Sequence, residues 1–207
     1  MTGHDYPAIA LLELDSIAVG IRTADAMVKR APISVLKAGT VHPGRYLVLV
    51  GGSVASVDEA AVAGRSAAGE WLNDETVLPD VEPRLTAALL GRHTALERDA
   101  LIVLETRSAP CLLAATDAAL KATTVSLARV RIADDLGGRC IALFDGELAD
   151  VEAAAEVVAE RVPGEHLLHV ALVPRLDSAV QSLLNGGTRF HAAAGVRPEG
   201  AEIDAHR

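Results

Sequence analysis

Apolar residues occur along the first half of the chain with two different spacings. Residues 8–14 form a nearly continuous apolar run, which predicts a strand. Ile21, Ala24 and Val28 then recur at helical intervals, and Pro32 ends that helix. The first half therefore predicts a strand over 8–14, a helix over 20–29, a strand over 33–37, a loop over 38–44, a strand over 45–50, a helix over 56–71, a short strand over 76–79 and a helical stretch to residue 90.

The second half of the chain repeats this pattern, with the same landmarks in the same order. Glu13 recurs as Glu105, 92 positions later, whereas Gly52 recurs as Gly146, 94 positions later. Two additional residues therefore lie in one loop of the second half. Repetition over this length predicts two tandem lobes of one fold.

The order of the elements predicts the fold class. Each half consists of strand, helix, strand, hairpin loop, strand, helix and strand, which is the split βαβ order of ferredoxin-like folds. We therefore expect an α/β (α+β) protein of two tandem ferredoxin-like lobes, each with a four-stranded antiparallel sheet and helices on one face. The expected boundaries are residues 7–97 for the first domain, 98–184 for the second and 185–207 for a flexible C-terminal tail.

Composition and charge exclude several classes of protein. Of 207 residues, 50% are hydrophobic but only 2% aromatic, so both cores must consist mainly of aliphatic side chains. A net charge of −9 without a basic patch argues against nucleic-acid binding. No apolar run is long enough for a bilayer, and the first residues lack the features of a signal peptide, so we expect a cytosolic protein without membrane contact.

Searches for catalytic chemistry identify no enzyme site. Ser53 follows two glycines, as in a nucleophile elbow, but the equivalent segment of the second half carries glutamate there, so we interpret the segment as a turn. Cys111 and Cys140 lack the spacing of a metal or redox motif, and we expect both to be small buried residues. His166 and His169 lie three apart in an expected strand, where they point to opposite faces and do not share an ion. We predict a protein that is not an enzyme.

Several short motifs together resemble one protein family. They are Glu13-Leu14-x-Ser16-Ile17-Ala18-x-Gly20, Ala24-Asp25-Ala26-x-x-Lys29, Pro43-Gly44-Arg45-Tyr46, Gly52-x-Val54-x-x-Val57 and Val173-Pro174-Arg175. On these motifs, which extend over residues 7–184, the chain resembles the tandem-domain, trimeric shell proteins of bacterial microcompartments. The unpermuted order of its strands and helices is similar to that of the propanediol-utilisation type.

This resemblance implies a structural role. Three chains would form a flat, pseudo-hexameric homotrimer that tiles beside other shell proteins, both hexamers and pentamers, around cargo enzymes in a bacterial microcompartment in the cytoplasm. Lys29 and Lys121 match the edge lysines of the family, and Arg175 matches the edge arginine that contacts the next ring. The first lobe has Asp80 in place of that arginine, so its edge is expected to differ.

The resemblance also implies a central pore, surrounded by the loop between the second and third strands of each lobe. The expected pore-lining residues are Val41, His42 and Pro43 in the first lobe and Asp134, Asp135, Leu136 and Gly137 in the second. Carboxylates facing the axis would favour cations or uncharged polar metabolites. The two aspartates would otherwise act only as capping residues of a long loop.

His42 leaves the chemistry of this pore open. In the propanediol-utilisation type, the resemblance places a cysteine at this position, and three copies hold an iron–sulfur cluster on the axis. Three imidazoles suit a metal such as zinc, or replace thiolates at a cluster. Without a metal, His42 simply lines a polar pore, and no cofactor is then expected. The functions under consideration are a structural shell subunit with a pore, a metal-carrying or electron-transfer shell protein, and a ferredoxin-like ligand-binding regulator.

Overall fold

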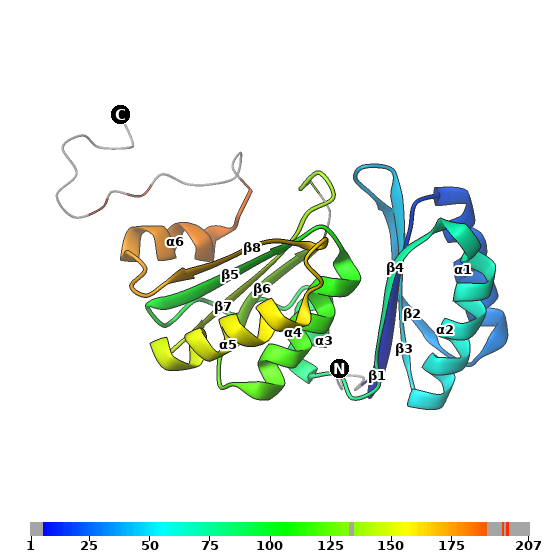
Figure 1. The fold of residues 1–207 in the computed structure, drawn as a ribbon, viewed down its shortest axis with the longest axis horizontal. Coiled ribbons are helices and arrows are strands. Elements are labelled where there is room, and N and C mark those ends of the chain that lie inside the picture. Colours follow the sequence, from blue (N-terminus) through cyan, green and yellow to red (C-terminus); the bar gives the residue numbers. More distant parts are fainter. Residues whose placement is uncertain (1–5, 133–134, 190–195, 197, 199–207) are drawn as a thin grey trace.

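Two four-stranded antiparallel sheets, one from each half of the chain, form the framework of the protein (Figure 1). The computed structural model describes residues 6–132, 135–189, 196 and 198. The strand order is β2-β3-β1-β4 in the first sheet and β6-β7-β5-β8 in the second, so both lobes have one topology. The predicted fold class, two tandem lobes with antiparallel sheets and helices, is confirmed.

The elements follow the same order in both halves. The first half contains β1 (Ala8–Leu14), α1 (Ile17–Arg30), β2 (Ser34–Val41), β3 (Arg45–Gly52), α2 (Val54–Ala68), a 3₁₀ turn η1 (Gly69–Trp71), β4 (Leu72–Leu78) and α3 (Pro83–Leu89). The second half contains β5 (Ala100–Thr106), α4 (Ala109–Ala122), β6 (Ser126–Ile132), β7 (Cys140–Gly146), α5 (Leu148–Arg161), β8 (Leu167–Val173) and α6 (Ser178–Gly186).

Helix boundaries differ from the prediction where a serine caps the first turn. The helix expected from residue 20 begins at Ile17, because the Ser16 side chain accepts a hydrogen bond from the backbone N–H of Val19. In the same way, the helix expected over 56–71 begins at Val54 behind the cap of Ser53 and ends at residue 68. Ser53 therefore serves as the N-cap residue where the chain turns from β3 into α2.

Strand boundaries were also predicted too short. β2 runs to Val41 rather than to residue 37, because the segment expected as a loop pairs with β3, with Ala38 opposite Val48 and Thr40 opposite Tyr46. β4 begins at residue 72 rather than 76, because its polar first half pairs with β1. The local sequence conceals both extensions, because Gly39 interrupts the apolar alternation of β2 and the first half of β4 is mostly polar.

The first strand has both faces covered, which explains its continuous apolar run. Its even-numbered side chains, such as Leu12, pack against the core under α1 and α2, whereas Ile9 and Leu11 belong to a cluster that continues into the second lobe. Figure 1 shows α1 and α2 on the side of the first sheet that faces away from the second lobe. The odd face of β1 is consequently an interface between lobes.

Where the first helix of each lobe crosses its sheet, the large and the small residue of the contact are reversed between the two lobes. A Cβ atom at Gly20 of α1 would lie 2.5 Å from the Cβ of Tyr46 on β3. The equivalent pair in the second lobe is Leu112 and Cys140, both buried. A glycine facing a large ring is thus replaced by leucine facing a small thiol, so the combined volume is kept.

Helix α3 joins the lobes although it follows the first sheet in the sequence. It packs against β6 and α4, with Leu85 fully buried in the core of the second lobe. The Arg84 guanidinium donates hydrogen bonds to the carbonyl oxygens of Leu120 and Val125, each at 2.9 Å. In return, α4 packs against β4 and β1 of the first lobe. This reciprocal packing fixes the lobes relative to each other.

Substitution of Gly20 tests the close approach of α1 to β3. Gly20→Ala should lower the free energy of unfolding by about 1–2 kcal/mol, because overpacking costs more than the improved helix propensity returns. Gly39→Ala is the matched control, since no heavy atom lies within 4 Å of the added Cβ, and it should change stability by less than about 0.5 kcal/mol. Urea denaturation measures both, and equal effects of the two changes would contradict this packing account.

Candidate functional site

The β2–β3 hairpin carries the three residues expected at a pore in the first lobe. Val41 ends β2, and its carbonyl oxygen accepts a hydrogen bond from the N–H of Gly44 at 3.0 Å. His42 and Pro43 form the exposed turn and are joined by a cis peptide bond. The imidazole of His42 is thus presented at the tip of a short turn rather than within a long loop.

The longer β6–β7 hairpin of the second lobe lies directly beside this turn. Asp134 falls outside the described residues. A Cβ atom at Gly138 would lie 2.9 Å from Cδ of Pro43 and 3.4 Å from the carbonyl oxygen of His42. Gly138 and Gly137 both have positive φ, at 85° and 61°, so glycine permits this approach. The structure therefore brings the two expected pore loops together within one chain.

The remaining residues of the second hairpin are exposed or turn residues, and one of them is neutralised. Asp135 adopts a φ of 60°, and its carboxylate forms an ion pair with the Arg189 guanidinium at 2.8 Å. The carbonyl oxygen of Leu136 accepts a hydrogen bond from the N–H of Arg139 at 3.1 Å. The charge expected from Asp135 is therefore largely balanced inside the chain.

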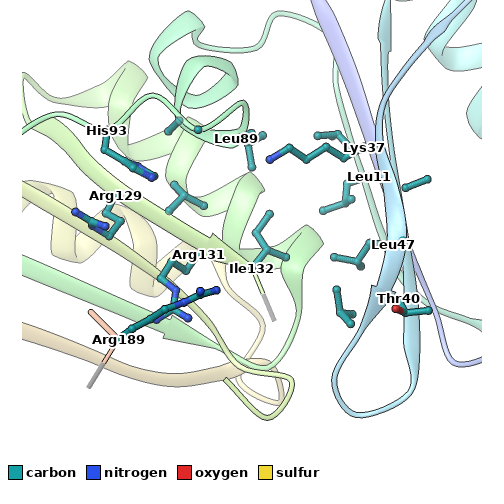
Figure 2. A pocket seen from close by; sticks show the side chains of 17 residues that line it. Leu11, Lys37, Thr40, Leu47, Leu89, His93, Arg129, Arg131, Ile132 and Arg189 are labelled. Atoms are coloured by element: carbon teal, nitrogen blue, oxygen red, sulfur yellow. The ribbon is translucent and has the colours of Figure 1, made fainter. Parts of the chain in front are cut away.

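A cavity of about 640 Å³ lies behind the two hairpins, between β2, α3 and β6 (Figure 2). Its apolar wall includes Leu11, Leu47, Leu49, Leu89 and Ile132. Its polar wall carries nitrogen-bearing side chains, which are Lys37, His93, Arg129, Arg131 and Arg189. No carboxylate is among the described residues that line it. Figure 2 shows the amine of Lys37 extending from the first sheet toward Leu89, with the arginines on the opposite side.

The basic side chains raise the electrostatic potential inside this cavity. Burial lowers the pKa of His93 below its ordinary value, and the nearby charges of Arg129 and Lys37 lower it further. Because these cations disfavour a further positive charge, the same field favours an anion.

The expected edge residues lie on exposed parts of the molecule. Lys29 forms an i,i+4 ion pair with Asp25 at 2.6 Å near the end of α1, and both side chains are exposed. Lys121 forms the equivalent pair at 2.7 Å, but its Asp117 is buried and also accepts the backbone N–H of Glu82. Arg175 is exposed just beyond β8. The Lys29–Asp25 pair is thus open to solvent, whereas the Lys121–Asp117 pair is partly covered within the chain.

A buried carboxylate marks the interface between the lobes. Glu13 of β1 has a side chain only 2% exposed, and it accepts the backbone N–H of Ala109 at 2.9 Å and Nη1 of Arg45 at 2.5 Å. Burial raises the pKa of Glu13, while the Ala109 N–H and the Arg45 guanidinium act in the opposite direction. Glu13 therefore binds the first turn of α4 to the first sheet.

A second polar cluster at this interface was missed by sequence reasoning. Asp74, Cys111 and His166 each offer a ligand atom, and these atoms all lie within 4.8 Å of one another. Cys111 is half-buried, and its thiol donates to Asp74 Oδ2 at 3.1 Å, so the expectation of a small buried cysteine is wrong for Cys111 and correct for Cys140. Burial and the contact with Asp74 raise the pKa of Cys111 to about 12.

The expectation that His166 lies within a strand is also wrong. β8 begins at Leu167, so His166 precedes it and turns toward the lobe interface. His169 is exposed in β8 and is not a member of the cluster. His42 likewise belongs to no group of three or more potential ligands among the described residues of one chain.

Charge removal at Lys37 tests the potential of the cavity. Lys37→Gln should move the pKa of His93 part of the way back toward 6.5, because one of two nearby cations is lost. Because the pKa of His93 is lower in the folded state than in the unfolded chain, the unfolded chain binds the imidazole proton more readily. Protonation of His93 therefore lowers the free energy of unfolding as pH falls below 6.5. NMR titration of the His93 ring measures the shift. Lys29→Gln, outside the cavity, is the control and should leave the pKa of His93 unchanged.

Comparison with known proteins places both lobes in one family. The family model described as BMC domain matches residues 8–81 and again residues 100–176. The chain is 37% identical over 169 residues to the bacterial microcompartment shell protein PduT of Citrobacter freundii, covering 81% of this chain and 92% of that protein. It is 31% identical over 186 residues to the carboxysome assembly protein CcmO of a Synechocystis species, covering 82% of this chain and 61% of that protein.

Solved structures agree with the sequence relatives. A microcompartment protein from Desulfitobacterium hafniense has a TM-score of 0.74 and 33% sequence identity, covering 84% of this chain and 98% of that chain. In the described part of the present chain, every helix is too short or too polar to cross a membrane. Since the two family matches cover most of its length, this chain belongs to the BMC-domain family of bacterial microcompartment shell proteins, with two such domains in tandem.

Proposed function

We propose that three copies of this chain form a pseudo-hexameric ring that tiles in the microcompartment shell, with the β2–β3 and β6–β7 hairpins around a central pore. The observation that carries this proposal is a difference in exposure between equivalent surfaces of the two lobes. Within one chain, each lobe covers an apolar surface of the other lobe. The equivalent surfaces at the two outer ends of the chain are exposed. A neighbouring copy would cover them in the same manner.

The first helix of each lobe supplies the clearest comparison. Leu113 of α4 is fully buried against the first lobe, whereas its counterpart Ile21 of α1 is 56% exposed. Ala109 and Leu120 are buried in the same way, and their counterparts Ile17 and Val28 are exposed. Exposed isoleucine and valine along one helix form an apolar face that favours burial by a partner.

The opposite end of the chain offers the complementary surface. Leu85 of α3 is fully buried, whereas its counterpart Val180 of α6 is 44% exposed. Glu13 is 2% exposed and accepts the N–H of Ala109, whereas its counterpart Glu105 is 28% exposed. In a ring, Glu105 of one chain would accept the N–H of Ile17 from the next.

Joining one end of the chain to the other end of a second copy is a heterologous contact. Such contacts close into rings when the rotation between neighbours divides a full turn. Two similar lobes per chain give six positions in a ring of three, and the interface between chains repeats the interface within each chain. The three-chain ring follows the resemblance to trimeric tandem shell proteins described above.

This arrangement assigns tiling and passage rather than catalysis to the protein. Lys29, Lys121 and Arg175 would lie at the ring edge and contact other shell proteins of the cytoplasmic compartment, including hexamers and pentamers. The hairpin tips with His42, Pro43 and Gly137 would surround the pore. Because Asp135 is paired with Arg189 and the adjoining cavity is basic, we infer that Asp135 contributes little negative charge to the pore.

Two alternatives have distinct signatures. A metal or iron–sulfur centre held by three His42 side chains would make the protein an electron-transfer or metal-carrying subunit, and the exposure of His42 at a hairpin tip permits this geometry. A ligand-binding regulator would use the basic cavity between the lobes and would remain a monomer or dimer. Metal content separates the first alternative from the main proposal, and subunit number separates the second.

A native mass spectrum of the untagged protein tests both points at once. We expect a mass of three times 21.5 kDa, because the apolar ends of each chain are covered only in a closed ring. A monomer or dimer would exclude the shell ring and favour the regulator. Additional mass from a metal or cluster that is lost in His42→Ala would instead support the metal-carrying subunit.

A charge on α1 tests the proposed contact between chains. Ile21→Asp should weaken each interface by at least ~3 kcal/mol, or more than 100-fold in association constant, because a carboxylate would be buried without a partner. Val62→Asp is the matched control, since Val62 is 59% exposed and its counterpart Glu156 of α5 is exposed in this chain, whereas α4 packs against the first lobe. Sedimentation velocity should find the trimer lost only in the first variant. Retention of the trimer in Ile21→Asp would remove α1 from the interface.

A further inference from the structure

The polar cluster at the lobe interface has the composition of a metal site. We propose that Asp74, Cys111 and His166 bind one divalent cation of borderline softness, such as Zn²⁺, between the two lobes of each chain. The site lies within a single chain, so this inference does not depend on the proposed ring. It is also separate from His42, which lies at the tip of a hairpin.

The donor set determines the class of ion. A thiolate, an imidazole and a carboxylate suit Zn²⁺ or Co²⁺, whereas Mg²⁺ and Ca²⁺ prefer oxygen ligands alone. Three protein ligands leave one tetrahedral position for water or another ligand. The residue types alone therefore favour an ion of borderline softness.

The distances are compatible with such an ion after small adjustments. Ligand atoms around tetrahedral zinc, with bonds of about 2.0–2.3 Å, lie roughly 3.5 Å apart. Here Cys111 Sγ and Asp74 Oδ2 are 3.1 Å apart, and all three ligand atoms lie within 4.8 Å of one another. A movement of about 1 Å would bring atoms up to 4.8 Å apart to the spacing of a tetrahedral site.

Backbone and capping interactions hold the three ligands in place. Ser108 caps α4, accepts the N–H of Cys111 at 3.1 Å and donates its hydroxyl hydrogen to Asp74 Oδ2. The N–H of His166 donates to the carbonyl oxygen of Pro163 at 2.9 Å, and its own carbonyl accepts the N–H of Arg107 at 2.8 Å. Groups of this kind orient metal ligands and limit the entropy lost on binding.

Charge also favours a cation at this position. Asp74 of β4 and Glu13 of β1 lie directly opposite each other on neighbouring antiparallel strands. Arg45 already pairs with Glu13, and the donors recorded for the Asp74 carboxylate are neutral: the Ser108 hydroxyl, the Cys111 thiol and the backbone N–H of Glu75. On binding, the metal–sulfur bond forms, the Cys111 S–H bond breaks and the proton leaves to solvent.

The repeat shows that the cluster is particular to this interface. The counterparts of Cys111, Asp74 and His166 in the other lobe are Val19, His169 and Trp71. In the proposed ring, the equivalent contact forms between the second lobe of one chain and the first lobe of the next. That contact would have neither the thiol nor the carboxylate. The expected stoichiometry is one ion per chain, which connects β4 of the first lobe to α4 and the β8 loop of the second.

Cobalt substitution tests the site with a spectroscopic readout. Metal-free protein in its native assembly would be titrated with Co²⁺ under reducing conditions. We expect a thiolate-to-cobalt charge-transfer band and intense tetrahedral visible bands that saturate at one Co²⁺ per chain and disappear when Zn²⁺ is added. Cys111→Ser should abolish the charge-transfer band, and His166→Gln should weaken Co²⁺ binding at least about 10-fold.

The second cysteine provides the matched control. Cys140 is a buried residue at the start of β7 and belongs to no group of three or more potential ligands among the described residues, so Cys140→Ser should retain the full spectrum, as should His42→Ala. Circular dichroism checks that each variant is folded, and Asp74→Asn replaces Cys111→Ser if that variant is not. Absence of the charge-transfer band in the wild type, or its persistence in folded Cys111→Ser, would overturn the proposal. A native mass spectrum with no trimer would leave this site intact while excluding the ring.

Discussion

The structure depends on the buried contact between the first sheet and the first turn of α4. Glu13 has to be buried there because it lies on the odd-numbered face of β1, together with Ile9 and Leu11, and this face meets the second lobe. A buried carboxylate is costly unless it is paired and hydrogen-bonded. Arg45 and the N–H of Ala109 meet that requirement from both lobes. The relative position of the lobes is therefore set by an electrostatic requirement as well as by apolar packing.

Duplication gave the chain two copies of one surface, and their environments explain where the copies differ. α4 is covered by the sister lobe and most of its residues are buried, whereas α1 keeps charged residues beside an exposed apolar face. Glycine and tyrosine in the first lobe correspond to leucine and cysteine in the second, since each helix must fit its own sheet. Such paired differences preserve the fold while the two interfaces acquire different chemistry.

The functional features lie on separate parts of this framework. The two hairpins meet through Pro43 and Gly138, the basic cavity lies behind them, and the cluster of Asp74, Cys111 and His166 lies at the lobe interface. A shell subunit needs rigid edges for tiling, because small angular errors accumulate over many rings. A contact that fixes the angle between lobes serves this need, and a cation bridging the lobes would reinforce it. Variation in the hairpins can then change the pore without changing the ring.

The sequence by itself determined the tandem repeat, the order of strands and helices and the family, because these depend on local periodicity and on short motifs such as Ala24-Asp25-Ala26. It also placed the two hairpins that carry His42 and Asp135. It did not determine that β2 continues to Val41, since pairing with β3 overrides the turn signal of Gly39. Only the tertiary structure decided that α3 packs on the second lobe and that Asp74, Cys111 and His166 meet. These contacts join residues far apart in sequence across an interface, where no local pattern records which side chains will face one another.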